Sequence, residues 1–188
     1  MPLRISFDLR EADLRHFEEL AQQTQSQERR RSAESIIAAA RDVLADGERA
    51  HLAEFVKERF ARLRAMLEMA TDADWQVSGE DQQRIINALG CFSAAPQANG
   101  QPVTAGLLDH AIMIELVSRD LEHDLVAFRD FCKFRESQLN RRAGHADLRQ
   151  QQLEQRRTAL HTRMHTRRQR DLDRAGSSVR KLFSLFGL

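Results

Sequence analysis

The sequence predicts an all-helical protein, a bundle of five or six helices with a C-terminal basic helical arm. Turn-forming residues are rare, with 8 Gly and 3 Pro in 188 residues, and Tyr does not occur. Ala, Leu, Arg, Glu and Gln dominate the composition, and these residues favour helices over strands. A chain of this length can bury a core without metal or disulfide staples.

Apolar residues recur at helical spacing through the first half of the chain. The predicted helices there cover residues 9–24, 32–47 and 52–70. Asp8 and Glu11 have the spacing of a capping box at the start of the first helix. Ser32 is a residue type that caps the start of a helix, and Gly47 is one that ends it.

Two further helices are predicted before the arm. The first covers residues 80–92, and the second begins at Thr104 and continues past Cys132. Residues 93–102 contain two of the three prolines and an Asn-Gly pair, which predicts a loop between them. Residues 107–117 are apolar on two helix faces, so we expect this segment to be the central helix of the bundle.

The charge is divided between the two ends of the chain. Residues 133–188 carry 14 Lys and Arg against 5 Asp and Glu, whereas residues 1–132 carry 15 against 23. This asymmetry predicts an acidic helical bundle over residues 1–135 and a basic arm over residues 136–188. We expect the arm to dock on the acidic body, in the same chain or in a dimer.

The cysteines and the hydropathy pattern predict a cytoplasmic protein. Cys91 and Cys132 do not form a CxxC pair, which argues against a disulfide framework or a structural zinc site, and their redox role stays open. The first residues lack the apolar stretch of a secretory signal. The longest apolar segment, residues 105–117, is shorter than the roughly 20 residues that span a bilayer.

One set of residues between positions 75 and 135 has the order and spacing of a known family: Trp75, Leu89, Phe92, Gly106–Asp109, Ala111–Val117 and Phe131–Arg135. In these residues the segment resembles the YkvA-like family, a bacterial domain of unknown function. Family members have a segment that reads roughly Pro-x-Asp-x-Ile-Pro-Asp-x-x-Pro before an Asp-Asp pair. Here those positions are held by Ala94, Pro96, Asn99, Gly100 and Val103, and His110 replaces the second Asp of the pair. The resemblance implies the family's helical fold in a divergent member that lacks the Ile-Pro-Asp loop signature.

Asp109, His110, Asp120 and Asp124 are the candidates for chemistry. Asp109 and His110 could form an acid–base pair, but consecutive helical residues point about 100° apart. Asp120 and Asp124 are spaced i,i+4 beside His123, which is a weak signal for a metal site. We therefore predict no catalytic residue, metal or cofactor. The alternative is a metal-binding protein or hydrolase-like enzyme centred on these four residues.

The arm contains a second pair with metal-ligand spacing. His161 and His165 are i,i+4 and could hold a transition metal from one helix face, but arginines surround them and repel cations. The same arginines could contact phosphates. Residues 136–181 contain no aromatic side chain to stack on bases, so we do not expect a nucleic-acid partner.

The last twelve residues, 177–188, predict a short amphipathic helix. Val179, Leu182, Phe183 and Phe186 share one face, and Arg180 with Lys181 makes a positive side. Such a helix lies on an anionic membrane surface or packs into a protein groove.

The favoured function is a non-enzymatic interaction or scaffold module. Its arm and tail would meet a partner protein, a second copy of the chain, or the inner face of the membrane. The residues we expect to make this contact are Arg167, Arg168, Arg170, Arg180, Lys181, Leu182, Phe183 and Phe186.

Overall fold

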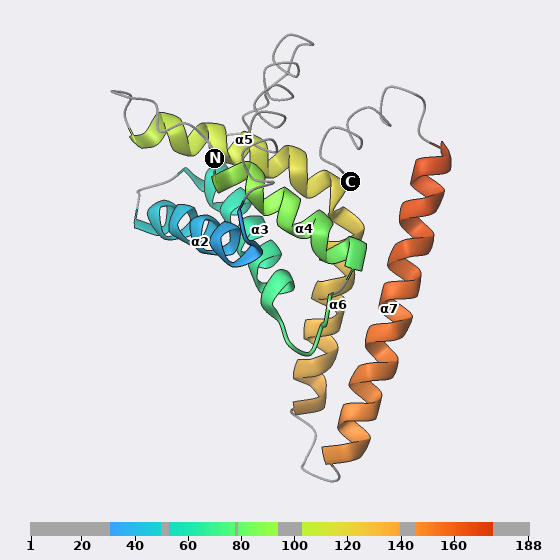
Figure 1. The fold of residues 1–188 in the computed structure, drawn as a ribbon. Helices are drawn as coiled ribbons and strands as arrows, with labels where there is room; N and C mark the ends of the chain where they lie inside the picture. Colours follow the sequence, from blue (N-terminus) through green and yellow to red (C-terminus); the bar gives the residue numbers. More distant parts are fainter. Residues whose placement is uncertain (1–30, 50–52, 78, 94–102, 140–145, 175–188) are drawn as a thin grey trace, which may run out of the picture.

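The protein is an all-α bundle, as the sequence predicts. The computed structural model describes residues 31–49, 53–77, 79–93, 103–139 and 146–174, with the backbone alone at 92, 93, 103–109 and 146. These residues form six helices and no strand: α2 (Ala33–Arg49), α3 (Glu54–Thr71), α4 (Gly79–Ser93), α5 (Val103–Asp120), α6 (Glu122–Leu139) and α7 (Ala146–Arg174) (Figure 1). The predicted helix over 9–24 and the tail over 177–188 lie outside the described residues.

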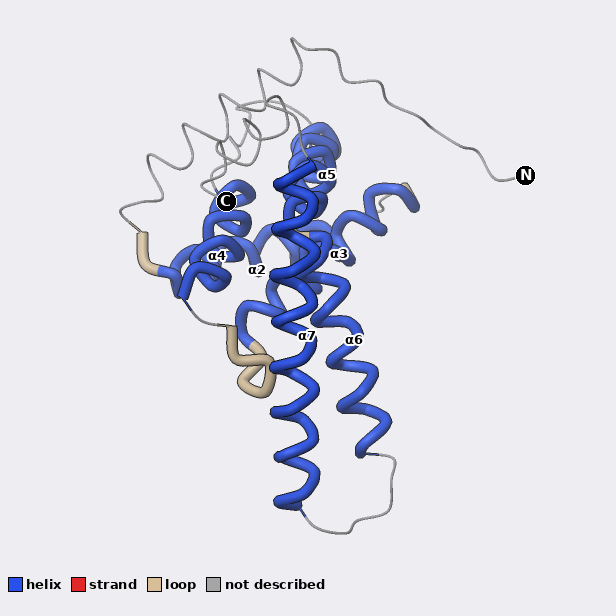
Figure 2. Tube along the Cα trace, turned by 90° about the vertical axis from the view of Figure 1, so that its right-hand side faces the viewer, coloured by secondary structure: helices blue, strands red, loops and turns tan. Residues whose placement is uncertain are grey.

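Helices α2 to α5 gather at one end of the molecule, and α6 and α7 form a long antiparallel pair (Figures 1 and 2). Helix α2 packs against α3 and α4, and α3 packs against α5. The free ends of α6 and α7 extend beyond the other helices in both views. None of the helices in the described ranges is long and apolar enough to cross a membrane.

One apolar core joins the bundle to the arm. Its largest fully buried side chain is that of Trp75, which is 1% exposed, and the core extends from Ile36 in α2 to α7. Helix α7 contributes Leu153, Leu160 and Met164, which are all buried. Burying a side chain of this size contributes about 1.5–3 kcal/mol. The sparse apolar residues of the arm therefore fix it to the body.

Helix α5 packs against α3, α4 and α6, whereas α3 is the described helix that packs against all of α2, α4, α5 and α6. Ile114 and Val117 are fully buried, and Ile112 and Leu116 pack against the core from other faces of the helix. The prediction that residues 107–117 form the central helix is wrong among the described helices, because α3 takes that position, although residues 111–117 do contribute buried side chains to the core. The capping prediction for α2 is confirmed, because the Ser35 N–H donates to Ser32 Oγ at 3.3 Å.

The prediction of one uninterrupted helix from Thr104 past Cys132 is wrong. The chain turns at Leu121, and α5 and α6 run in different directions (Figure 1). At the turn, Arg84 Nη2 of α4 donates to the Asp120 carbonyl oxygen at 3.2 Å. A side chain that inserts into the backbone hydrogen-bond ladder is a known cause of helix kinks. Glu122 and Asp124 then supply the negative charge that favours a new helix N-terminus.

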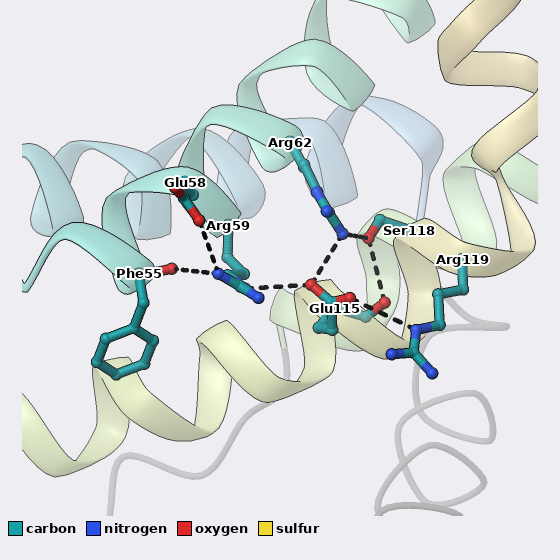
Figure 3. A network of polar contacts seen from close by, with 7 residues as sticks. All are labelled: Phe55, Glu58, Arg59, Arg62, Glu115, Ser118 and Arg119. Carbon is teal, nitrogen blue, oxygen red and sulfur yellow. Dashed lines mark hydrogen bonds and ion pairs between the residues drawn. The ribbon is translucent and has the colours of Figure 1, made fainter. Parts of the chain in front are cut away.

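A network centred on Glu115 joins α3 to α5 (Figure 3). Its carboxylate is 3.1 Å from Arg59 Nε, 2.8 Å from Arg62 Nη1 and 3.4 Å from Arg119 Nε. Arg62 also donates to Ser118 Oγ at 3.0 Å. Burial by itself would raise the pKa of Glu115, but the three arginines outweigh it and hold the pKa below its usual value.

The connection between α3 and α4 is fixed onto α6 and α7. Asp72 Oδ1 accepts from the N–H groups of Asp74 and Trp75, both at 2.9 Å, which forms a tight turn. Arg135 of α6 pairs with Asp72 at 2.8 Å and with Asp74 at 3.0 Å. Arg157 of α7 donates to the Asp74 carbonyl at 3.0 Å. The turn thereby holds Trp75 between the last two helices.

Candidate functional site

Charged side chains gather where α7 passes α4 and the junction of α5 and α6. We call this group the charged cluster. Its members are Asp81 and Arg84 of α4, Asp120 of α5, Asp124 of α6, and His161, His165 and Arg168 of α7. Charged groups are seldom buried unless they are paired, so the cluster is the most unusual polar feature of the described residues.

Asp124 is the most buried charged residue of the cluster, at 1% exposure. Its Oδ1 accepts from Arg168 Nη2 at 2.7 Å and from Arg84 Nη1 at 3.4 Å. Its Oδ2 is buried and has no hydrogen-bond partner among the described residues. Burial raises the pKa of Asp124, and the two guanidinium groups limit that rise.

Asp81 divides its two oxygens between different partners. Its Oδ1 accepts from Arg168 Nη1 at 2.8 Å and lies 3.9 Å from Arg84 Nη1. Its Oδ2 lies 3.1 Å from His165 Nε2. One oxygen therefore neutralises guanidinium charge, and the other faces the histidines of α7.

Asp120 lies at the edge of the cluster with its carbonyl bound to Arg84. Burial raises the pKa of the Asp120 carboxyl to about 6, although the charge of Arg84 opposes the rise. Burial also lowers the pKa of Arg84, against the attraction of Asp124. A carboxyl in this range changes its charge under mildly acidic conditions.

His161 is held against Trp75, with the ring centroids 4.3 Å apart. Burial lowers the pKa of His161, while the negative charge of Asp81 opposes that shift. The Nε2 atom of His161 is buried without a partner in the described parts of the chain. Three residues of the cluster could hold a metal, namely Asp81, His161 and His165. Each offers one ligand atom, and these three atoms lie within 4.8 Å of one another.

The structure brings together only half of the predicted candidates for chemistry. Asp120 and Asp124 are both in the charged cluster. His110 lies ten residues before Asp120 on α5, which is about 15 Å along a helix axis. The Asp109 side chain is outside the described part of the chain. His123 lies 2.6 Å from Asp171 of α7 and not in the cluster.

The arginines of the arm are turned toward the body. Arg163 pairs with Asp130, Arg168 pairs with two acids of the cluster, and the Arg156 guanidinium lies 5.6 Å from the centre of the Phe134 ring. The arm thus docks on the acidic body within one chain. Arg167 and Arg170 are exposed, and the predicted contact residues from Arg180 to Phe186 lie outside the described residues.

Asp81 and Arg84 were not predicted from the sequence as members of a site. A charge in the first turn of a helix is ordinarily explained by the helix dipole. The overlooked signal is their spacing with Ile85 and Ala88, because positions 81, 84, 85 and 88 share one helix face, and Ile85 and Ala88 are buried. An aspartate and an arginine on an otherwise apolar helix face, here Asp81 and Arg84, predict a buried ion pair.

Replacing Arg168 by Met tests how far the cluster holds the helices together. The change leaves Asp124 buried with Arg84 alone, so we expect the free energy of unfolding to fall by about 3 kcal/mol. Adding Asp124→Asn should recover part of the loss, because the two residues contact each other. Urea unfolding followed by Trp75 fluorescence measures both effects. The exposed neighbour change Arg167→Met should stay within about 0.5 kcal/mol of wild type, and an equal loss there would contradict the assignment.

Asp120→Asn should change how stability depends on pH. The folded protein binds the Asp120 proton more tightly than the unfolded chain does, so this carboxyl lowers the free energy of unfolding as pH rises from about 4 to about 6. Relative to wild type, the variant should gain on the order of 2 kcal/mol between pH 4 and pH 7. Denaturant unfolding at several pH values measures the gain. A parallel pH profile for the two proteins would refute it, and the exposed change Asp42→Asn is the control.

A scan of the chain against protein-family models found no match. Searches of curated proteins and of solved structures also found none. The resemblance to the YkvA-like family therefore stays a prediction that depends on the residues quoted above, and any proposal on function has to come from the geometry of the chain itself.

Proposed function

We propose that the protein is a non-enzymatic helical interaction module that binds a partner protein through the free end of the α6–α7 pair. The observation that supports this is the position of two exposed leucines. Leu139 ends α6 and is 62% exposed, and Leu148 lies in the first turn of α7 and is 52% exposed. They are the large apolar side chains reported as exposed among the described residues, and both flank the same connection.

The shape of the molecule supports the same proposal. The end of the α6–α7 pair lies away from α2 to α5, so a partner can reach it from several sides (Figures 1 and 2). Neighbouring exposed apolar side chains on a soluble domain mark interaction surfaces, whereas single ones do not. The two leucines lie near uncharged glutamines such as Gln151 and Gln152. A partner protein with an apolar groove would therefore bind this surface best.

The charged cluster supports a scaffold more than a reaction centre. Arg84 and Arg168 occupy Oδ1 of Asp124, and Arg168 occupies Oδ1 of Asp81. Carboxylates paired in this way hold helices in place and are poor proton carriers. A rigid base lets the end of the α6–α7 pair present its leucines in one orientation.

The family and the location belong to the same proposal. Membership of the YkvA-like family would suit a helical module without a fixed reaction. A cytoplasmic location, with the tail at the inner face of the membrane, would suit two reduced cysteines and an amphipathic terminal segment.

Glutamates at both leucine positions test the contact surface. Because both side chains are exposed, the variant Leu139→Glu with Leu148→Glu should fold and keep its helical circular dichroism. We expect its affinity for the partner captured from native extract to fall at least about tenfold, which corresponds to 1.4 kcal/mol. Quantitative affinity capture with mass readout measures this loss.

The matched control changes the opposite end of α7. Arg167→Glu with Arg170→Glu alters two exposed residues there and should leave capture unchanged. If both variants capture the same proteins equally well, the leucines are not the contact surface. If wild type is a dimer by light scattering and only the leucine variant is a monomer, the occupant is a second copy and the partner-protein proposal fails.

Deleting residues 177–188 tests the role of the amphipathic tail. If the tail lies on anionic lipid, the deletion should abolish sedimentation with phosphatidylserine-containing liposomes, and the protein should stay in the supernatant. Replacing Phe183 and Phe186 by Ser should weaken sedimentation in the same direction. Wild type that fails to sediment with these liposomes would refute membrane contact.

A further inference from the structure

We propose that Asp81, His161 and His165 form a binding site for a divalent transition metal, with Zn²⁺ as the ion that fits them best. The site goes beyond the proposed interaction surface, since His161 lies at the middle of α7, thirteen residues after Leu148 and about 20 Å from it along the helix axis. It combines two imidazole nitrogens on successive turns of α7 with one carboxylate oxygen from α4.

The spacing of the three ligand atoms suits an ion. His165 Nε2 and Asp81 Oδ2 are 3.1 Å apart. One ligand atom from each of the three residues lies within 4.8 Å of the other two. Around a tetrahedral Zn²⁺ with bonds near 2.0–2.1 Å, ligand atoms are separated by about 3.3 Å. Closure therefore needs the ligand nitrogen of His161 to approach the other two residues by at most about 1.5 Å.

His161 is oriented as a metal ligand would be. Its Nε2 is buried without a hydrogen-bond partner in the described residues, and its ring is held against the Trp75 ring, with the centroids 4.3 Å apart. A histidine ring whose orientation is fixed by its neighbours presents its free nitrogen in one direction. An unpartnered buried nitrogen is costly unless a ligand occupies it.

The nearby arginines do not exclude a cation, because body residues already bind them. Arg168 is held by Asp124 and by Oδ1 of Asp81, and Arg84 is held by Asp124 and the Asp120 carbonyl. Oδ2 of Asp81, which faces the histidines, is free of guanidinium contacts in the described structure. The sequence argument that arginine charge repels a metal from His161 and His165 therefore does not apply to the folded chain.

Two imidazoles and one carboxylate favour Zn²⁺ over Mg²⁺ or Ca²⁺, which prefer oxygen ligands. The His165 side chain is 52% exposed, so an ion can enter from solvent. Beside it lies an open hollow of about 610 Å³ that Arg84, His165 and Arg168 help to line. A fourth coordination position would be left for water.

Metal titrations of the full chain test the site. We expect one Zn²⁺ to bind by calorimetry and to raise the melting temperature. Co²⁺, which quenches indole fluorescence at short range, should quench Trp75, because His161 lies against that ring. His165→Gln and His161→Gln should each weaken Zn²⁺ binding by at least the roughly 10–100-fold that loss of an outer partner of a metal site costs.

His123 supplies the matched control. It contacts Asp171 as His165 contacts Asp81, but the described residues place no third metal ligand beside it. His123→Gln should bind Zn²⁺ as wild type does and keep the Co²⁺ quenching. His165 is half exposed, so its variant is expected to fold even if the His161 variant does not. Absence of saturable Zn²⁺ binding, or equal binding by wild type and His165→Gln, would overturn the proposal whether or not the leucines bind a partner.

Discussion

The arrangement of the last four helices depends on one buried carboxylate. Asp124 receives Arg84 from α4 and Arg168 from α7, so three helices meet on a single side chain that is 1% exposed. Removing one partner of a buried ion pair lowers the free energy of unfolding more than replacing both partners by apolar residues does, because the remaining charge stays buried without a partner. Arg168 thereby joins α7 to α6, and Arg84 also binds the Asp120 carbonyl at the turn between α5 and α6.

This arrangement explains why the basic arm is a part of the body. Leu153, Leu160 and Met164 bury apolar surface along α7, while Arg157 and Arg163 reach acceptors on the turn before α4 and on α6. Apolar contacts supply most of the attraction, and the ion pairs fix the register. Arg135, Arg163 and Arg168 pair with acids outside the arm, so part of the excess positive charge of residues 133–188 is matched within the described structure.

The two proposals use different parts of α7. At its N-terminal end, Leu148 is exposed, as is Leu139 at the end of α6, and exposed leucines on one end of a helix pair are the property of a contact surface. From the middle of α7 onward, Asp81 lies between two histidines and two arginines, and its two oxygens serve different partners. A metal there would add a third tie between α4 and α7 and stabilise the base from which the leucines project.

The sequence by itself determined the all-helical class and the positions of α2, α3 and α4 to within a few residues. Apolar periodicity and the Ser32 cap suffice for that, since they act within one or two turns. It also singled out Asp120, Asp124, His161 and His165 as candidates for chemistry, while predicting no metal there.

Only the tertiary structure decided that these residues lie together with Asp81 and Arg84. It also decided that the chain bends at Leu121, because Arg84 comes from another helix to take the Asp120 carbonyl. Contacts between residues 36 to 87 positions apart depend on how helices pack, and helical spacing along one segment carries no information about them.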